Sequence, residues 1–316
     1  MTRSPSAARP RLRIGTRGSP LARAQAELVR RALEAAHPDL AEPGALEVVI
    51  MRTTGDRVVD RPLAEIGGKG LFCKEIEAAL HERSIDLAVH SMKDLPTVLP
   101  DGLTVGAMLE REDPRDVLIA RAGPARAGLQ GLPEHAVVGS ASLRRKAQLL
   151  AHRPDLEIVP MRGNVDTRLR KLAAGEVDAT VLALAGLKRL AADLAGAVVL
   201  EPEEMLPAVG QGAIGIECRT EARILDLLAA LDHVSTTACV RAERALLDAL
   251  DGSCRTPIAG YAEVRGATLR LRALVARPDG SAIFRAARTG PMESGEALGR
   301  DAGVELRRRA GPGFFD

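Results

Sequence analysis

Arg-Leu-Arg-Ile-Gly-Thr-Arg-Gly-Ser-Pro-Leu-Ala, residues 11–22, marks the first passage from a strand into a helix. The apolar run around Ile14 predicts a strand that ends in the glycine-containing segment 15–18. Ser19 and Pro20 then predict a helix start, because serine caps free N–H groups and proline suits the first helical position. Apolar residues continue at roughly helical spacing to Leu33, so the stretch predicts an α/β fold.

The same order of strand, polar turn and helix recurs along the first two-thirds of the chain. Strands are predicted at 46–51, 86–90, 137–139, 156–159 and 177–184, and helices at 71–83, from 143, from 165 and at 185–190. This alternation predicts a parallel or mixed sheet covered on both faces. From about residue 235 the pattern changes to a helix at 236–250, strands at 267–276 and 281–287, and a last helix at 294–309.

Length and composition narrow the classes of protein. A chain of 316 residues predicts two or three domains, the last a small α+β domain, and segment 53–70 predicts a long mobile loop. The net charge of +2 says little about partners, whereas the 2% aromatic content argues against stacking on single-stranded nucleic acid. No segment has the features of a secretory signal or a membrane span, so we expect a cytoplasmic protein.

Basic and hydroxyl side chains gather where the predicted strands end, which is where open α/β sheets bind ligands. These residues are Arg17, Ser19, Lys93, Ser140, Ser142, Arg144, Arg145, Arg162 and Arg168, with Lys188 and Arg189 after the last helix of the series. Such groups bind carboxylates or phosphates, so the pattern predicts a cleft for a polyanion larger than one phosphate. Taken singly, each arginine pair is better explained as a partner in surface ion pairs. Because several strand ends carry the same kind of residue, an anion-binding site is the favoured interpretation. Walker A spacing is absent, and Lys69 in segment 67–70 lacks a preceding strand.

Two further side chains, Asp94 and Cys254, are candidates for chemistry, whereas His90 is not. Asp94 is the one carboxylate among the basic residues, and it either stabilises a developing cation or forms a salt bridge with Lys93 or an arginine. His90 lies in an apolar strand and is predicted to be buried. Cys254 follows a Gly-Ser turn and precedes Arg255, so a reactive and an inert thiol are equally good interpretations.

The other cysteines show no spacing for zinc or disulfides, so no metal site is expected. Cys218 and Cys239 fit packing positions, whereas Cys73 is expected to be partly exposed.

Eight motifs in this chain resemble those of the porphobilinogen deaminase family. They are Ile14–Ala22, Gly67–Phe72, Val89–Pro96, Gly139–Arg145, Arg162–Arg168, Ala185–Leu190, Val209–Ala213 and Asp251–Cys254. The motifs occur in the family's order and span residues 12 to about 260. The sequence departs from common family residues at Gly18, Glu65 and Ala141, where glutamine, lysine and serine are frequent.

The resemblance implies an α/β fold of two periplasmic-binding-protein-like doubly wound domains and a small α+β C-terminal domain. The implied bounds are 11–110 with 208–232, 111–207, and 233–316. The implied activity is that of a transferase, hydroxymethylbilane synthase, in tetrapyrrole and haem biosynthesis. It joins four porphobilinogen molecules head to tail with loss of ammonia, and water then releases hydroxymethylbilane. We expect a monomer with this small-molecule substrate and neither nucleic acid nor membrane as a partner.

The resemblance also implies a role for each site residue. A dipyrromethane cofactor is attached covalently through Cys254, and Asp94 stabilises the cation formed as ammonia leaves. The implied cofactor contacts are Lys69, Lys93, Ser140, Ser142, Arg144, Arg145, Arg168 and Arg189. The implied substrate contacts are Arg17, Ser19, Arg162, Arg168 and Arg189.

Two other protein classes share some of these features. A non-catalytic two-domain protein that binds an anionic solute would have the same basic strand ends, but it needs neither a third domain nor Cys254. An effector domain of a LysR-type regulator would follow a helix-turn-helix segment, whereas this chain begins with a predicted strand.

Overall fold

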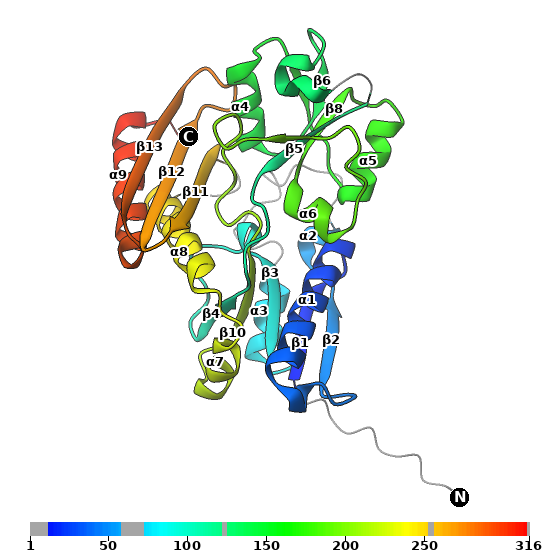
Figure 1. The fold of residues 1–316 in the computed structure, drawn as a ribbon, viewed down its shortest axis with the longest axis vertical. Helices are drawn as coiled ribbons and strands as arrows, with labels where there is room; N and C mark the ends of the chain where they lie inside the picture. Colours follow the sequence, from blue (N-terminus) through cyan, green and yellow to red (C-terminus); the bar gives the residue numbers. More distant parts are fainter. Residues whose placement is uncertain (1–11, 58–72, 122–124, 252–255, 315–316) are drawn as a thin grey trace, which may run out of the picture.

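The computed structural model describes residues 12–57, 73–121, 125–251 and 256–314, which form three β-sheets (Figure 1). We call them the N-terminal, middle and C-terminal sheets. The N-terminal sheet has the order β2-β1-β3-β10-β4. Its strands are β1 (Leu12–Arg17), β2 (Leu46–Met51), β3 (Leu87–Ser91), β4 (Leu103–Met108) and β10 (Ile214–Arg219). The first three are parallel, and β10 runs antiparallel between β3 and β4.

The middle sheet repeats this topology in the order β7-β6-β8-β5-β9. Its strands are β5 (Asp116–Ala120), β6 (Val137–Gly139), β7 (Glu157–Val159), β8 (Ala179–Ala183) and β9 (Val198–Leu200). Strand β6 is parallel to β7 and β8, whereas β5 is antiparallel to β8 and β9. The chain therefore passes from the N-terminal sheet to the middle sheet after β4 and returns before β10.

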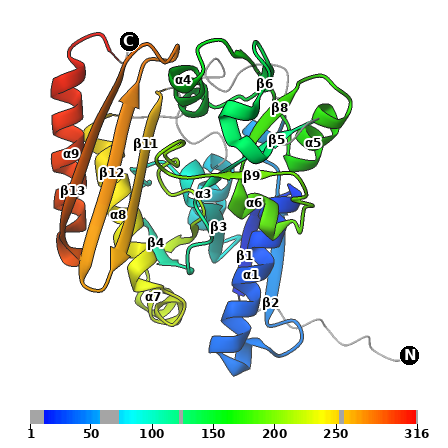
Figure 2. The same cartoon turned by 45° about the horizontal axis from the view of Figure 1, so that its top comes forward.

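Helices flank both sheets (Figures 1 and 2). Those of the N-terminal part are α1 (Pro20–Ala36), α2 (Thr54–Arg57), α3 (Lys74–His81) and α7 (Ala222–Ala229), and those of the middle part are α4 (Leu143–His152), α5 (Val165–Ala173) and α6 (Leu184–Arg189). Short 3₁₀ turns are η1 (Pro38–Leu40), η2 (Met92–Asp94), η3 (Ala125–Gly131) and η4 (Met292–Ser294). Helix α1 begins as predicted, since the Ser19 hydroxyl oxygen accepts a hydrogen bond from the Ala22 N–H. Its buried face, which includes Val29 and Leu33, packs on the sheet core.

The C-terminal sheet is antiparallel, in the order β11-β12-β13. Its elements are β11 (Ile258–Arg265), β12 (Thr268–Ala276), β13 (Ile283–Pro291), α8 (Val234–Ala249) and α9 (Gly295–Ala310). Side chains of both helices, such as Leu246 and Leu306, share one core with the sheet. The hairpin turn after β12 reaches helix α4, where a side chain on Gly280 would come within 2.7 Å of the Ala147 carbonyl oxygen.

Glu243 of α8 connects this C-terminal part to both passages between the other sheets. Arg111, in the outgoing passage, donates to the two carboxylate oxygens of Glu243 at 2.6 and 3.1 Å. The Gly210 N–H, in the returning passage, and the Ala262 N–H of β11 donate to the same carboxylate at 2.7 Å. Glu243 is fully buried, so these charge-assisted bonds fix three segments around one side chain.

The predicted fold class, two doubly wound α/β parts and a small α+β part, is confirmed by the topology. The prediction missed strands β4, β5, β9, β10 and β11. Strand β10 is buried along its whole length, so its sequence lacks the alternation that marks a half-buried strand. The predicted mobile loop 53–70 is wrong at its start, because Thr54–Arg57 is helix α2, and residues 58–70 lie outside the described residues. The three sheets fall within the three predicted ranges, and the domain bounds themselves stay predictions.

Candidate active site

Asp94 lies at the carboxyl end of β3, in the 3₁₀ turn η2. Its side chain is exposed and, within the part of the chain that the structure describes, has no basic group within 4.0 Å. Among the described residues, the salt bridge with Lys93 or an arginine that the sequence left open is therefore not present. A cavity of about 50 Å³ is lined by Asp94, Arg17 and Ser19, which brings together three of the predicted site residues. A carboxylate without a basic partner is free to stabilise a cation that develops on a ligand.

The floor of this cavity contains two titratable groups, Cys73 and His90. The expectation that Cys73 is partly exposed is wrong: the residue is 1% exposed, because the start of α3 packs against Met92 and Leu95. Burial raises the pKa of the Cys73 thiol, and its Sγ lies 3.8 Å from the Asp94 carbonyl oxygen. His90 is buried as predicted, with Nε2 2.8 Å from a Glu217 carboxylate oxygen. Cys218 and Cys239 are also buried as predicted.

On the middle sheet, Arg144 and Arg145 bind Asp116, a residue that the sequence analysis did not single out. Arg144 Nη2 lies 2.7 Å and Arg145 Nη2 2.8 Å from the two carboxylate oxygens of Asp116. Arg144 also donates to the Leu206 carbonyl oxygen at 2.7 Å and is 5% exposed. Burial alone would raise the pKa of Asp116, but the two guanidiniums lower it well below its usual range. Arg144 is thus held inside the protein, and Arg145 keeps one side free.

That free side belongs to a cluster of three guanidiniums, which we call the arginine cluster: Arg145, Arg162 and Arg168. Arg145 Nε and Arg162 Nη1 are buried and make no hydrogen bond in the described structure. Burial, together with the charges of Arg145 and Arg162, lowers the pKa of Arg168 to about 10. Buried donors without acceptors are costly and are rare in folded proteins. The cluster therefore offers positive charge and hydrogen-bond donors to an anionic ligand.

Lys93 interacts electrostatically with residues of both the N-terminal and the middle part. It follows β3 of the N-terminal sheet, next to Asp94. Burial, opposed by the charge of Asp94 and reinforced by that of Arg145 of the middle part, lowers the pKa of Lys93 to about 8. Lys93 of the N-terminal part and Arg145 of the middle part therefore lie near enough for their charges to interact. A ligand carboxylate between them would offset the positive charges of both Lys93 and Arg145.

The remaining predicted residues have defined places. Ser142 caps α4, its oxygen accepting from the Arg145 N–H at 3.4 Å, and the Ser142 N–H donates to Ser140 Oγ at 3.2 Å. Arg189 donates to the Gly212 carbonyl oxygen at 2.6 Å. Its neighbour Lys188 forms an ordinary surface ion pair with Glu112. Cys254, Lys69 and the departure at Glu65 lie outside the described residues.

Two buried glutamines also belong to the site and were missed. Gln25 of α1 lines the Asp94 cavity and donates to Ser91 Oγ at 2.8 Å. Gln211 donates to Asp116 at 2.8 Å. Gln211 stands between Gly210 and Gly212. A polar residue between two glycines was therefore the signal available in the sequence.

Comparison with known proteins gives the family. The model of the "Porphobilinogen deaminase, dipyromethane cofactor binding domain" matches residues 12–226, and that of the "Porphobilinogen deaminase, C-terminal domain" matches 237–308. The chain belongs to the porphobilinogen deaminase family. The porphobilinogen deaminase of Paracoccus denitrificans (strain Pd 1222) is 54% identical over 317 residues, covering 100% of this chain and 99% of the relative. The chloroplastic porphobilinogen deaminase of Oryza sativa subsp. japonica is 54% identical over 309 residues, covering 96% and 86%.

Membership confirms the predicted family, its transferase activity and its dipyrromethane cofactor.

Among solved structures, the methionine-binding protein MetQ aligns with a TM-score of 0.43 and 14% identity over 70% of this chain and 89% of that chain. The described residues include no helix long and apolar enough to cross a membrane. They also include no group of three or more His, Cys, Asp or Glu side chains placed to hold a metal ion.

The arginine cluster fits the family's cofactor. Each pyrrole of a dipyrromethane carries two carboxylates. Arg145 Nε and Arg162 Nη1 are buried donors that have no acceptor in the part of the chain that the structure describes. Arginine binds carboxylates through such donors with well-defined geometry. The residues present therefore suit the group that the family requires.

Proposed function

We propose that this chain joins four porphobilinogen molecules head to tail on a dipyrromethane held by Cys254 and releases hydroxymethylbilane by hydrolysis. In each step a carbon–carbon bond forms at the aminomethyl carbon, the carbon–nitrogen bond breaks, and ammonia leaves with the proton of the displaced C–H. The observation that carries the proposal is the arginine cluster, in which two buried donors have no acceptor among the described residues. The exposed Asp94 lies next to Lys93, whose pKa is affected by both Asp94 and Arg145.

In this proposal the basic residues bind carboxylates. When bound, the dipyrromethane supplies the terminal pyrrole carbon at which the chain grows. Arg145, Arg162 and Arg168 hold the acidic side groups, with Ser140, Ser142 and Lys69 as further contacts, and Arg17, Ser19 and Arg189 hold the incoming substrate. A carboxylate beside Lys93 would raise the pKa of this amine from about 8 and keep it protonated. Arg144 then acts mainly through Asp116 and Arg145, because its own donors bind Asp116 and Leu206.

Asp94 has the opposite task. Loss of ammonia from porphobilinogen leaves a delocalised cation, and the neighbouring arginines would raise its energy. A carboxylate at the ring N–H lowers that energy where the charge develops. We also propose, from the family resemblance, a cytoplasmic monomer without a nucleic-acid partner.

Replacing Asp94 tests this role. Asp94→Ala should lower the turnover of porphobilinogen by about 100-fold or more, because one preorganised charge at a developing ion has an effect of this size. Release of ammonia and formation of hydroxymethylbilane are measured together. Asp101→Ala is the control, since Asp101 is an exposed aspartate in the turn before β4.

Intact mass keeps the test specific. Wild type, Asp94→Ala and Asp101→Ala should carry the mass of two pyrrole units, and Cys254→Ser should not. Near-normal turnover in Asp94→Ala would refute the role of Asp94. A loaded wild type that binds porphobilinogen without releasing ammonia would instead indicate a solute-binding protein.

A further inference from the structure

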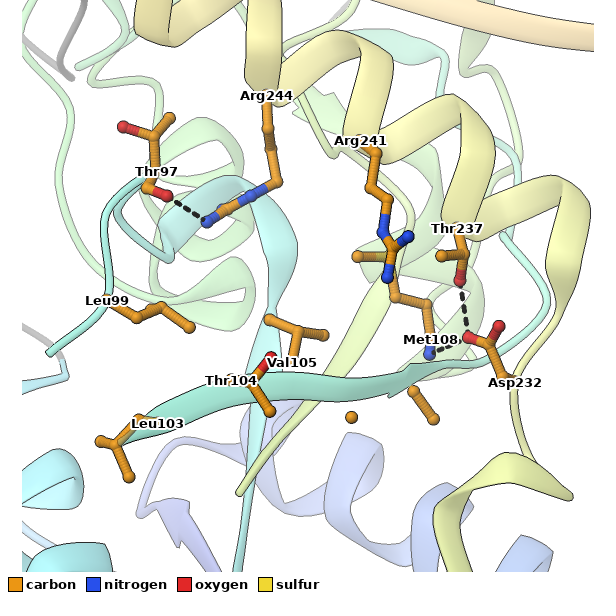
Figure 3. A pocket seen from close by; sticks show the side chains of 12 residues that line it. Thr97, Leu99, Leu103, Thr104, Val105, Met108, Asp232, Thr237, Arg241 and Arg244 are labelled. Carbon is orange, nitrogen blue, oxygen red and sulfur yellow. Dashed lines mark hydrogen bonds between the residues drawn. The ribbon is translucent and has the colours of Figure 1, made fainter. Parts of the chain in front are cut away.

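Arg244 of helix α8 binds the chain segment that directly follows Asp94. Its Nη1 donates to the Leu95 carbonyl oxygen at 3.1 Å. Its Nη2 donates to the Pro96 carbonyl oxygen at 2.6 Å. The same Nη2 donates to the Thr97 carbonyl oxygen at 3.0 Å (Figure 3). One guanidinium therefore occupies three consecutive carbonyls of the N-terminal part, although it belongs to the C-terminal part.

These carbonyls depend on Arg244. Residues 95–97 lie in neither helix nor strand, and no backbone N–H of the described residues donates to the three oxygens. A guanidinium has five N–H donors in a fixed plane, and its charge strengthens each bond. Arg244 has no carboxylate within 4.0 Å among the described residues, so no ion pair competes for these donors.

Packing supports the same contact. Val240, one turn before Arg244 on α8, is fully buried against Met92 and Leu95. Met92 begins the turn η2 that ends at Asp94, and Leu95 is extended. Apolar contact and hydrogen bonds from one face of α8 thus hold the residues on both sides of Asp94, while the Asp94 side chain remains exposed.

We infer that Arg244 is a positioning residue that fixes Asp94 for the condensation reaction from the C-terminal part of the molecule. The inference rests on the proposed role of Asp94. Helix α8 ends at Ala249, shortly before Cys254, so one helix leads to the cofactor attachment and also holds the turn that carries the stabilising carboxylate.

Arg241 provides a matched control on the same helix. Both arginines line a cavity of about 360 Å³ between β4 and α8 (Figure 3). Arg241 is exposed and makes no hydrogen bond or ion pair in the described structure. Substituting either arginine removes similar charge and volume at the same cavity, so the two variants differ in the contact with segment 95–97.

The experiment compares Arg244→Gln, Arg244→Lys and Arg241→Gln in loaded protein, with loading checked by intact mass and folding by the melting temperature. Arg244→Gln should lower kcat by about tenfold, because small displacements of a catalytic group reduce rate strongly. KM for porphobilinogen should change by less than about twofold, since substrate contacts stay in place. Arg244→Lys should be intermediate, because an ammonium reaches fewer carbonyls, and Arg241→Gln should match wild type.

A double variant tests whether Arg244 acts through Asp94. In an Asp94→Asn background, Arg244→Gln should add little to the loss of kcat, as expected for two groups in one pathway. A full additional loss there, or equal kcat for Arg244→Gln and Arg241→Gln, would overturn the inference. If Arg244→Gln fails to load, Arg244→Lys decides: wild-type kcat overturns the inference, and a lowered kcat with KM unchanged supports it. Wild-type turnover in Asp94→Asn alone would contradict the proposed function instead.

Discussion

Asp116 shows how a single buried residue shapes the site without contacting the ligand. It accepts from Arg144, Arg145 and Gln211 and is fully buried. One carboxylate thus faces two guanidiniums and neutralises only one of their two positive charges. The remaining positive charge contributes to the arginine cluster, of which Arg145 is a member. The site is basic because Asp116 does not neutralise both arginines.

Asp116→Asn should destabilise the protein strongly. The variant leaves two buried guanidiniums without their carboxylate, and breaking a buried ion pair on one side costs about 3–5 kcal/mol. Urea unfolding at pH 7 measures the free energy of unfolding. Asp155→Asn is the control, because the Asp155 carboxylate pairs with Arg153 nearer the surface, and little change is expected there.

The same pair predicts a dependence on pH. The guanidiniums hold the folded pKa of Asp116 below that of the unfolded chain, which is about 4, so its contribution is complete above that pH and is lost as pH falls further. The difference in free energy of unfolding between wild type and Asp116→Asn should therefore shrink below about pH 4. A difference that is constant down to pH 2 would contradict the ionised pair.

At the scale of elements, helices α8 and α9 approach unusually closely. Gly295, Gly299 and Gly303 lie one turn apart on α9 and face Ala238, Ala242 and Leu246 of α8. A side-chain carbon on Gly299 would lie 2.1 Å from the Ala242 carbonyl oxygen, which is far inside contact distance. The glycines therefore allow the two backbones to touch.

Gly299→Ala should destabilise the C-terminal part, because α9 must move away from α8. Overpacking of this kind costs about 1–3 kcal/mol, partly offset by about 1 kcal/mol of better helix propensity. Thermal unfolding and the fraction of chains loaded with dipyrromethane are the measurements. Gly186→Ala in α6 is the control, since its new carbon would meet Leu21 Cδ2 at an ordinary 3.6 Å. Equal melting temperatures for both variants would show that the helices can separate freely.

Local signals explain which elements could be predicted from the sequence. Strand β1 and the start of α1 depend on neighbouring residues such as Ser19 and Pro20, and the structure has both. Strand β10 depends on partners more than a hundred residues earlier, and its uniform burial removes the alternation. The ion pairs of Arg144 and Arg145 with Asp116 likewise join residues 28 and 29 positions apart. The gathering of basic residues could be read from the sequence, but the separate places of these two arginines could not.

At the scale of the whole molecule, Lys93 of the N-terminal part and Arg145 of the middle part are close enough for their positive charges to interact. Lys93 and Arg168 both have lowered pKa values, chiefly through burial, with nearby arginines adding to the effect. Their protonated forms therefore destabilise the folded protein at neutral pH until an anion arrives. Ligand binding should thus stabilise the whole fold.

The unloaded Cys254→Ser chain should therefore melt several degrees below the loaded wild type. Inorganic phosphate should raise the melting temperature of the unloaded chain more than that of the loaded one, because only the former has its arginine cluster open. Differential scanning calorimetry over a phosphate series, at ionic strength balanced with sodium chloride, measures both. An equal rise in the two proteins would place the phosphate effect elsewhere.

The position of β10 also determines the order in which the chain can fold as the ribosome makes it. All strands of the middle sheet lie between residues 116 and 200, so that sheet can close while later residues are still unsynthesised. Strands β3 and β4, made earlier, have no common partner until β10 emerges at 214–219. The middle of the polypeptide can therefore complete its sheet before the beginning does. During that interval the nascent strands of the N-terminal sheet have unpaired edges. The N-terminal part is therefore the part that most needs protection from aggregation.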